Sequence, residues 1–453
     1  MSVPAAPPPR RPFWSSPIAR LLILGLLFVL LLIPLGMIGG VVAERSQRQA
    51  EAQADITSKW GGAQSIVGPL LRVACVHRFQ QRDDKGWKAQ SVVMRELYLL
   101  PETLEARVQL NTEIRRRGIF EVPVYAAAVT LEGRFATPLL SQCPQPSTEI
   151  DWRRTDLVIG IADPRSVQAE AGLVWNGRRL QFAPATGAEA PLASGLHVPL
   201  GGVAGAFAQS EQTFSIVLSL RGANLMQLAP VGKETRVSIA GDWPHPSFQG
   251  AWLPLSHEAD AQGFDARWSL SWLGRDYPQA WTSAAAQAEP VSKSLFGVML
   301  ATPVDPYAMA VRVTKYAALT VLFTFFTVWL TEVLSGGRVH PIQYGFIGAA
   351  LCLFGLLQLS FAEHFGFTPA FVVAALAVTA LVTLYCRSVL GHNRRALGVG
   401  ALLGGLYGYL YAILSAEDYA LLGGSVALFA LLALAMYLTR RIDWVSAGAS
   451  AMP

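Results

Sequence analysis

The chain has 453 residues, of which 52% are hydrophobic and 15% are charged. Charged residues make up about a quarter of an ordinary soluble protein, so this composition excludes a wholly soluble enzyme. The formal charge is +5, yet residues 44–314 hold 26 basic and 26 acidic residues, so the positive excess lies in the hydrophobic parts of the chain. Membrane topology explains this distribution, and a nucleic-acid partner does not.

Six apolar stretches are long enough to cross a lipid bilayer as helices, which takes about 20 residues each. The loops 363–368 and 415–418 lie on one side of these stretches and contain no lysine or arginine, whereas arginines gather on the other side. The positive-inside rule therefore predicts that both termini are cytoplasmic. The predicted spans are residues 21–43, 316–334, 344–362, 369–390, 396–414 and 419–438.

This pattern predicts an α+β membrane protein with one N-terminal anchor helix, a five-helix C-terminal bundle, and a large mainly-β domain between the first and second helices. The apolar run of residues 21–43 ends on Val41-Val42-Ala43, which resembles a signal-peptidase site. It is longer than the roughly 7–15 residues of a signal peptide core, which favours an uncleaved anchor. The predicted parts are a Pro/Arg-rich cytoplasmic tail at 1–20, the anchor at 21–43, the exported domain at 44–314, the bundle at 315–438 and a cytoplasmic tail at 439–453.

Within the exported domain, residues 44–59 predict a helix that continues out of the bilayer, and the period of the pattern then changes to two. Apolar and polar residues alternate over 104–110, 214–220 and 264–272, as expected for half-buried antiparallel strands. In the last of these, Trp272 is expected to point inward. The dipeptide Asn176-Gly177 predicts a tight hairpin. These segments predict a sandwich or a set of packed sheets.

Two cysteines, Cys75 and Cys143, lie in the exported domain. An extracytoplasmic compartment permits a disulfide between them, and two free buried thiols are the alternative. No Cys/His spacing in the chain indicates a metal site, and no motif indicates a cofactor.

Polar residues stand at the ends of the predicted spans. Glu332, His340 and Gln343 are expected at the cytoplasmic end of the bundle, and Glu363 and His364 at its outer end. A Glu and a His at one membrane level can form a proton relay or bind a metal. Interfacial anchoring and hydrogen bonding at helix ends are the alternative explanation.

Small residues recur at intervals of four along the fifth predicted span. Gly400, Gly404 and Gly408 form the middle of this row, between Ala396 and Ala412. Such a row lets another helix approach closely, so the prediction is helix packing within the bundle. A dimer interface or a permeation path are the alternatives, and the oligomeric state stays open.

In the exported domain, Pro244 and Pro246 alternate with bulky side chains. Proline restricts its own backbone and that of the preceding residue, which predicts a stiff segment outside any strand ladder. Aromatic residues on such a loop can contact a peptide or a sugar, or they can close one end of the β core. The candidate binding residues are Trp243, His245, Ser247 and Phe248.

Enzymatic function has little support in the sequence. Ser425 is a serine at membrane level, but His340, His364 and His392 are expected in loops, away from it. No catalytic residue is assigned, and the chain is expected not to be an enzyme.

A set of short motifs is spread along nearly the whole chain: Leu32-Ile33-Pro34, Glu44-Arg45, Gly118-Ile119-Phe120, Val124-Tyr125, 243–248, Thr302-Pro303-Val304-Asp305, Tyr307, Lys315-Tyr316, Glu332, 340–344, Glu363-His364, 417–422, Thr439-Arg440 and Asp443-Trp444. Together these motifs resemble those of the CreD family of bacterial inner-membrane proteins. The resemblance implies an inner-membrane location, with the exported domain in the periplasm. It also implies a role in envelope integrity and the stress response under two-component control, including the responses to β-lactams and colicins, and no established enzymatic reaction. The expected partners are the bilayer and an envelope component or protein, with a transporter, or less readily an intramembrane enzyme, as the alternative.

Overall fold

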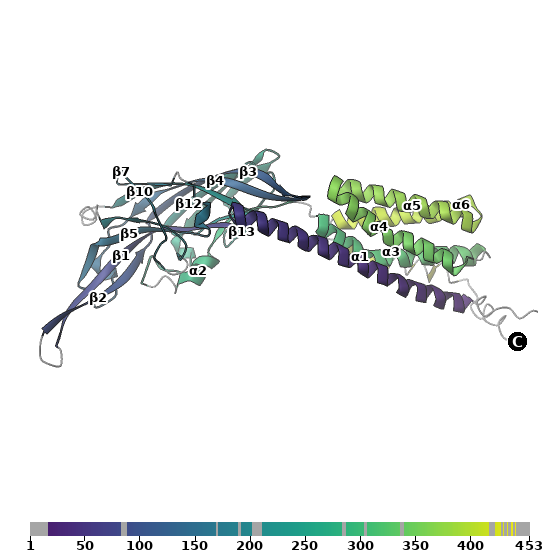
Figure 1. The fold of residues 1–453 in the computed structure, drawn as a ribbon, viewed down its shortest axis with the longest axis horizontal. Coiled ribbons are helices and arrows are strands. Elements are labelled where there is room, and N and C mark those ends of the chain that lie inside the picture. The colour runs from purple at the N-terminus through teal and green to yellow at the C-terminus, as the bar shows by residue number, and fades with distance from the viewer. Residues whose placement is uncertain are drawn as a thin grey trace, which may run out of the picture. The chain divides into compact units, whose positions relative to one another are not determined.

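The computed structural model divides the chain into two compact units, residues 1–49 with 304–453 and residues 50–303 (Figure 1). We call the first the helical unit and the second the β unit, and describe each by itself. The described residues are 17–82, 88–168, 171–188, 192–201, 211–282, 287–302, 306–335, 339–415, 422–426, 429, 433, 436, 437 and 440.

Helix α1 (Pro17–Trp60) contributes to both units. Its length confirms that residues 44–59 continue the helix of the first predicted span. In the β unit, the indole of Trp60 lies 4.3 Å from the guanidinium of Arg115 and 4.6 Å from that of Arg221. These cation–π contacts, together with the packing of Ile56 near Val122, attach the end of α1 to the β unit.

The β unit consists of two sheets (Figure 1). The first sheet has nine strands: seven follow one another in order, and β2 pairs with β1 and carries β16 beside it. The second sheet has eight strands. The strands of the first sheet, in spatial order, are β13 (Pro246–Gly250), β17 (Phe296–Leu300), β11 (Leu225–Leu228), β1 (Gln64–Arg82), β5 (Glu149–Ile161), β9 (Gly195–Pro199) and β8 (Ala183–Pro184), followed by β2 (Lys88–Leu99) and β16 (Ala280–Trp281). Those of the second are β14 (Ser256–Asp260), β15 (Gly263–Ser271), β12 (Glu234–Gly241), β3 (Thr103–Arg117), β4 (Phe120–Phe135), β10 (Gln212–Ala223), β6 (Gly172–Trp175) and β7 (Arg178–Leu180).

One hydrophobic core contains side chains from both sheets, so the sheets are packed against each other. In β3 the predicted alternation is confirmed, because Leu104 and Val108 are buried while Glu105 and Arg107 are exposed. The predicted alternation of β10 is confirmed in the same way. Short helical segments connect the strands: η2 (Leu140–Gln142), η3 (Pro164–Ser166), η5 (Trp272–Gly274) and α2 (Ala288–Lys293).

The predicted hairpin is also confirmed. Asn176 and Gly177 both have positive φ angles, 47° and 81°, between the paired strands β6 and β7. The predicted inward position of Trp272 is wrong, because β15 ends at Ser271. The Ser271 hydroxyl accepts a hydrogen bond from the backbone N–H of Leu273, which starts η5 and leaves Trp272 37% exposed.

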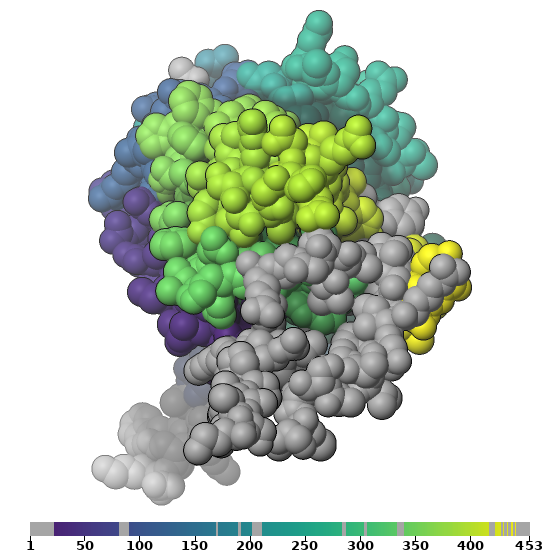
Figure 2. All heavy atoms as spheres, turned by 90° about the vertical axis from the view of Figure 1, so that its right-hand side faces the viewer, coloured from purple at the N-terminus to yellow at the C-terminus, as the bar shows by residue number. Residues whose placement is uncertain are grey.

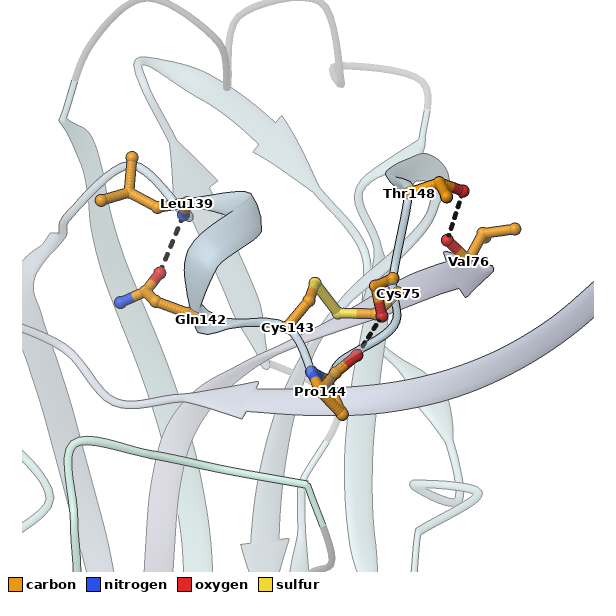
Figure 3. Close-up of a disulfide and its surroundings, with 8 residues drawn as sticks. Cys75, Val76, Leu139, Gln142, Cys143, Pro144 and Thr148 are labelled. Atoms are coloured by element: carbon orange, nitrogen blue, oxygen red, sulfur yellow. Dashed lines mark hydrogen bonds between the residues drawn. A yellow bond between two sulfur atoms is a disulfide. The ribbon is translucent and has the colours of Figure 1, made fainter. Parts of the chain in front are cut away.

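A disulfide joins Cys75 of β1 to Cys143, just after η2 (Figure 3). The two Cα atoms are 5.8 Å apart, within the usual range for such a bond. Of the two alternatives from the sequence, the structure therefore has the bonded one. The bond fixes the loop that leads from η2 to β5 against β1 at Cys75.

Within the described ranges, the helical unit contains the first part of α1 and the four long helices α3 to α6. Five helices among the described residues are long and apolar enough to cross a membrane, including α1. The sixth predicted span, 419–438, lies largely outside the described residues, as does the Pro-rich tail. Helices α4, α5 and α6 pack against one another around a second hydrophobic core. In the space-filling view, the green and yellow-green spheres of these helices lie against one another (Figure 2). The bounds of the four helices are α3 (Pro306–Ser335), α4 (Pro341–Phe365), α5 (Phe367–Leu390) and α6 (Asn393–Ser415).

Candidate functional site

The segment around Trp243 is largely packed against the β unit. The indole N–H of Trp243 donates a hydrogen bond to the carbonyl of Ala301 at 2.9 Å. The ring of Phe248 lies 6.0 Å from that of Trp268 and 6.4 Å from that of Phe264, measured between centroids. Both aromatic side chains are half-buried, which favours the alternative that they close an edge of the β core.

The prediction that this segment stays outside any ladder is wrong for its second half. Residues Pro246–Gly250 form β13 and pair with β17, and they form an edge of the nine-stranded sheet. Proline is tolerated there because it is the first residue of an edge strand. Ser247 and Phe248 therefore belong to the sheet, while His245 is exposed. Ligand binding by these residues stays a prediction.

At one end of the bundle, Glu332 of α3 is buried, with 4% of its surface exposed. The hydroxyl of Tyr344 on α4 donates a hydrogen bond to its carboxylate at 2.9 Å. Nearby in sequence, His340 caps the start of α4: its Nδ1 accepts from the N–H of Ile342, and its own N–H donates to the Gln343 side chain. In the described contacts, His340 and Gln343 therefore serve as a capping box for α4.

At the other end of α4, Glu363 accepts a hydrogen bond from the hydroxyl of Tyr307 on α3 at 3.0 Å. The guanidinium of Arg45 on α1 lies 3.7 Å from the same carboxylate oxygen. His364 is exposed, and its ring contacts the carbonyl of Ser360.

The polar residues at the span ends therefore form two groups rather than one site. Tyr344 and Glu363 are 19 residues apart on α4, which is about 28 Å along a helix and close to the roughly 30 Å of a bilayer core. At both ends a glutamate of one helix is bonded to a tyrosine of the other. This reciprocal arrangement fixes the register of α3 against α4.

Of the three glycines in the row on α6, only Gly400 packs closely against another described helix. A Cβ atom at Gly400 would lie 2.3 Å from Oγ1 of Thr383 on α5. Gly404 and Gly408 are exposed, and no described atom lies within 4 Å of a Cβ placed there. A step of four residues turns about 400°, so the row drifts around the helix away from the buried side at Leu403 and Tyr407.

A cavity that the sequence analysis missed lies beside the disulfide. Its volume is about 340 Å³. On the two strands its walls are His77 and Phe79 of β1 and Val93 and Arg95 of β2, which share one face because His77 pairs with Val93. Pro144 and Pro146 of the disulfide-bonded loop also line the cavity.

The polar groups of this cavity are few. The Nδ1 atom of His77 is buried and has no hydrogen-bond partner among the described residues. The ring of His77 stacks on Phe79, with 5.1 Å between centroids. Arg95 donates one hydrogen bond to the carbonyl of Gln145 at 3.1 Å, which leaves other guanidinium donors for a ligand.

On the opposite face of β1 and β2, the hydroxyl of Tyr98 donates to Glu96 at 2.6 Å, and Arg72 bridges Glu96 and Asp156. Burial, and then the hydrogen bond to Glu96, raise the pKa of the Tyr98 hydroxyl above its ordinary value. Tyr98 therefore stays protonated and keeps its role as a donor.

The profile of the family described as inner membrane protein CreD matches residues 16–445. The chain belongs to the CreD family. It is 32% identical over 418 residues to the inner membrane protein CreD of Escherichia coli (strain K12), which covers 92% of this chain and 91% of that protein. With its apolar helices, this CreD-family chain is an α+β protein of the bacterial inner membrane.

In this CreD-family chain, no group of three His, Cys, Asp or Glu residues that could hold a metal occurs among the residues described above. The resemblance had singled out Tyr307, while Tyr344 and Arg45 lay within its motifs, but nothing in the sequence assigned them to the two glutamates. The cavity was missed because its walls come from two strands and a distant loop. The only local indication in the sequence was the two-residue spacing of His77 and Phe79, which places both on one face of a strand.

Proposed function

We propose that this CreD-family chain binds or senses an envelope component through its β unit in the periplasm, while both termini stay in the cytoplasm. The proposed role belongs to envelope integrity and the stress response, including the responses to β-lactams and colicins. We propose binding rather than catalysis. The observation that carries the proposal is the cavity beside the Cys75–Cys143 disulfide.

Two observations support the periplasmic side. Disulfides persist in oxidising compartments such as the periplasm and are rare in the cytosol, and Cys75 and Cys143 are bonded. The loops 363–368 and 415–418 contain no basic residue, which by the positive-inside rule supports a position on the side away from the cytoplasm.

The lining of the cavity indicates what kind of molecule it takes. Its walls are mainly apolar and include Phe79 and Val93, so an apolar group of the ligand is buried there. Arg95 and the unpaired Nδ1 of His77 offer polar contacts beside it. An anionic group next to an apolar group fits this combination, because arginine binds carboxylates and phosphates in a forked geometry.

Photo-crosslinking in living cells tests this proposal. The residue p-benzoylphenylalanine is placed at Phe79, in the cavity, or at Trp272, which has the same 37% exposure but lies away from the cavity. We expect an envelope molecule to be captured from position 79 and not from position 272. Arg95→Ala should reduce the capture at least about tenfold, because the ligand loses a hydrogen bond to a charged group.

Equal capture at the two positions, or capture at position 79 that Arg95→Ala leaves unchanged, would show that the cavity is not the binding site. Insertion into the membrane and disulfide formation serve as controls for folding in each variant.

Transport is the second candidate, because a polar side chain buried inside the bundle has no hydrogen-bond partner among the described residues. Gln358 of α4 has no exposed surface, and neither atom of its amide has a hydrogen-bond partner among the described residues. Unpaired polar groups at membrane depth are costly and often line a path. Solute or proton flux in proteoliposomes that disappears on Gln358→Leu and on Glu332→Gln would support transport, whereas the binding proposal expects no flux.

Intramembrane proteolysis is the remaining alternative. The hydroxyl of Ser425 donates to the carbonyl of Leu422 at 2.9 Å, as in an ordinary helix turn. The binding proposal expects that Ser425→Ala leaves every cellular phenotype unchanged.

A further inference from the structure

Strand β2 has one edge that is open over most of its length. It pairs with β1 from Lys88 to Leu99, but β16 covers only Tyr98 and Leu99 on the other side. No strand among the described residues pairs with the remaining part of that edge. An open strand edge carries unpaired N–H and C=O groups and is a template for a further strand.

The hydrogen bonds around β2 show which residues point toward this edge. The N–H of Leu100 donates to the carbonyl of Gln279, on the β16 side. The N–H of Arg78 in β1 bonds Thr148, so the even-numbered residues of β1 face away from β2. The register of β1 and β2 is unbroken. By alternation, the even-numbered residues of β2 direct their backbone groups to the open edge.

Three consecutive side chains in the middle of this edge are exposed and apolar. Val92 is 42% exposed, Val93 40% and Met94 46%. Natural proteins protect such edges with proline, bulges or charged side chains. Residues 88–97 contain neither a proline nor a register shift, and their charged residues flank an uncharged stretch from Ala89 to Met94. An edge of this kind is therefore suited to pairing.

We propose that β2 pairs with β2 of a second copy of this chain, antiparallel, with Val92 opposite Val92 of that copy. Since only even-numbered residues offer backbone groups, this two-fold register also places Gln90 opposite Met94. It places Lys88 opposite Glu96 at both ends of the paired segment. Directly opposed opposite charges stabilise a strand pair, and like charges destabilise it.

Other two-fold registers lack this match. A register centred on Glu96 would oppose two glutamates, and one centred on Arg95 would oppose two arginines. The sequence of β2 is thus complementary in charge to itself in the register centred on Val92, which is why we assign a second copy as the occupant. The proposal does not depend on what fills the cavity, since the edge is formed by backbone groups.

Cysteine crosslinking of the full-length chain in inner-membrane vesicles tests the pairing. In the background Cys352→Ala, Cys386→Ala, we expect Val92→Cys to form a covalent dimer on oxidation, because directly opposed residues of this type have Cα atoms about 5.5 Å apart. Val217→Cys is the matched control. Val217 is 48% exposed, but its strand β10 is paired on both sides, with β4 and β6.

Mixed chains test the register. Gln90→Cys and Met94→Cys chains with different tags should crosslink to each other and not to themselves. Lys88→Glu should lower the yield of the Val92→Cys dimer several-fold, and adding Glu96→Lys should restore it. A Val92→Cys yield no higher than that of Val217→Cys, or crosslinking to a different protein in its place, overturns the proposal. If Lys88→Glu together with Glu96→Lys does not restore the yield of the Val92→Cys dimer, the register centred on Val92 is wrong.

Discussion

At the scale of single residues, the clearest feature is the pair of tyrosine–glutamate contacts at the ends of α3 and α4. Buried carboxylates are costly in a membrane protein unless they are hydrogen-bonded. The sequence singled out Glu332 and Glu363 because ionisable groups in or beside a span can form a relay or bind a metal. It could not supply their partners, since those depend on which helices pack together.

Tyr344→Phe tests the value of such a contact. The change keeps the ring but removes one hydrogen bond from buried Glu332, which should lower the free energy of unfolding by about 1.5–3 kcal/mol. Thermal unfolding of the purified chain in detergent measures this as a lower Tm. Tyr385→Phe is the control, because the Tyr385 hydroxyl makes no hydrogen bond among the residues that the structure describes. Equal Tm values for the two variants would show that the Tyr344 contact contributes nothing.

At the scale of elements, strands were predictable and their partners were not. Alternation in β3 and β10 reflects which side chains face the core, and that information is local. The parallel pairings of β1 with β11 and of β3 with β12 join segments more than a hundred residues apart. No local pattern encodes them. The misplacement of Trp272 has the same origin, since the alternation continues by chance past the serine that ends β15.

Helix α6 provides a matched pair of substitutions. Gly400→Ala places a methyl group against Thr383, and overpacking of this kind costs about 1–3 kcal/mol. Gly404→Ala meets no described atom and should be neutral or raise stability by up to about 1 kcal/mol, because alanine favours helix. Thermal unfolding in detergent compares the two. A larger loss from Gly404→Ala would mean that the exposed face of α6 is a packing surface.

The disulfide is the covalent link between β1 and the loop after η2. It closes a stretch of 68 residues, so the chain-entropy account predicts that the double change Cys75→Ser, Cys143→Ser lowers the free energy of unfolding by about 4 kcal/mol. Urea unfolding followed by tryptophan fluorescence measures the shift in midpoint. The same variant should lose photo-capture at Phe79, since the loop forms one wall of the cavity. An unchanged midpoint would contradict a structural role for the bond.

At the scale of the whole molecule, composition and charge predict most of the architecture. An anchor helix, a mainly-β domain and a group of apolar helices follow from hydropathy and alternation, and the structure has all three. The cavity was not predictable, because it depends on β1, β2 and a loop coming together. The binding function proposed for the β unit therefore rests on the structure and not on a motif.

We propose that the β unit faces the periplasm, while the loops between the bundle helices on the arginine-rich side face the cytoplasm. Leu253 of the β unit is 76% exposed, and Arg394 at the start of α6 is also exposed. Leu253→Cys and Arg394→Cys are labelled with a membrane-impermeant maleimide in cells whose outer membrane is permeable. We predict labelling of Leu253→Cys in intact cells, and of Arg394→Cys only after the inner membrane is opened. The reverse pattern would contradict the account.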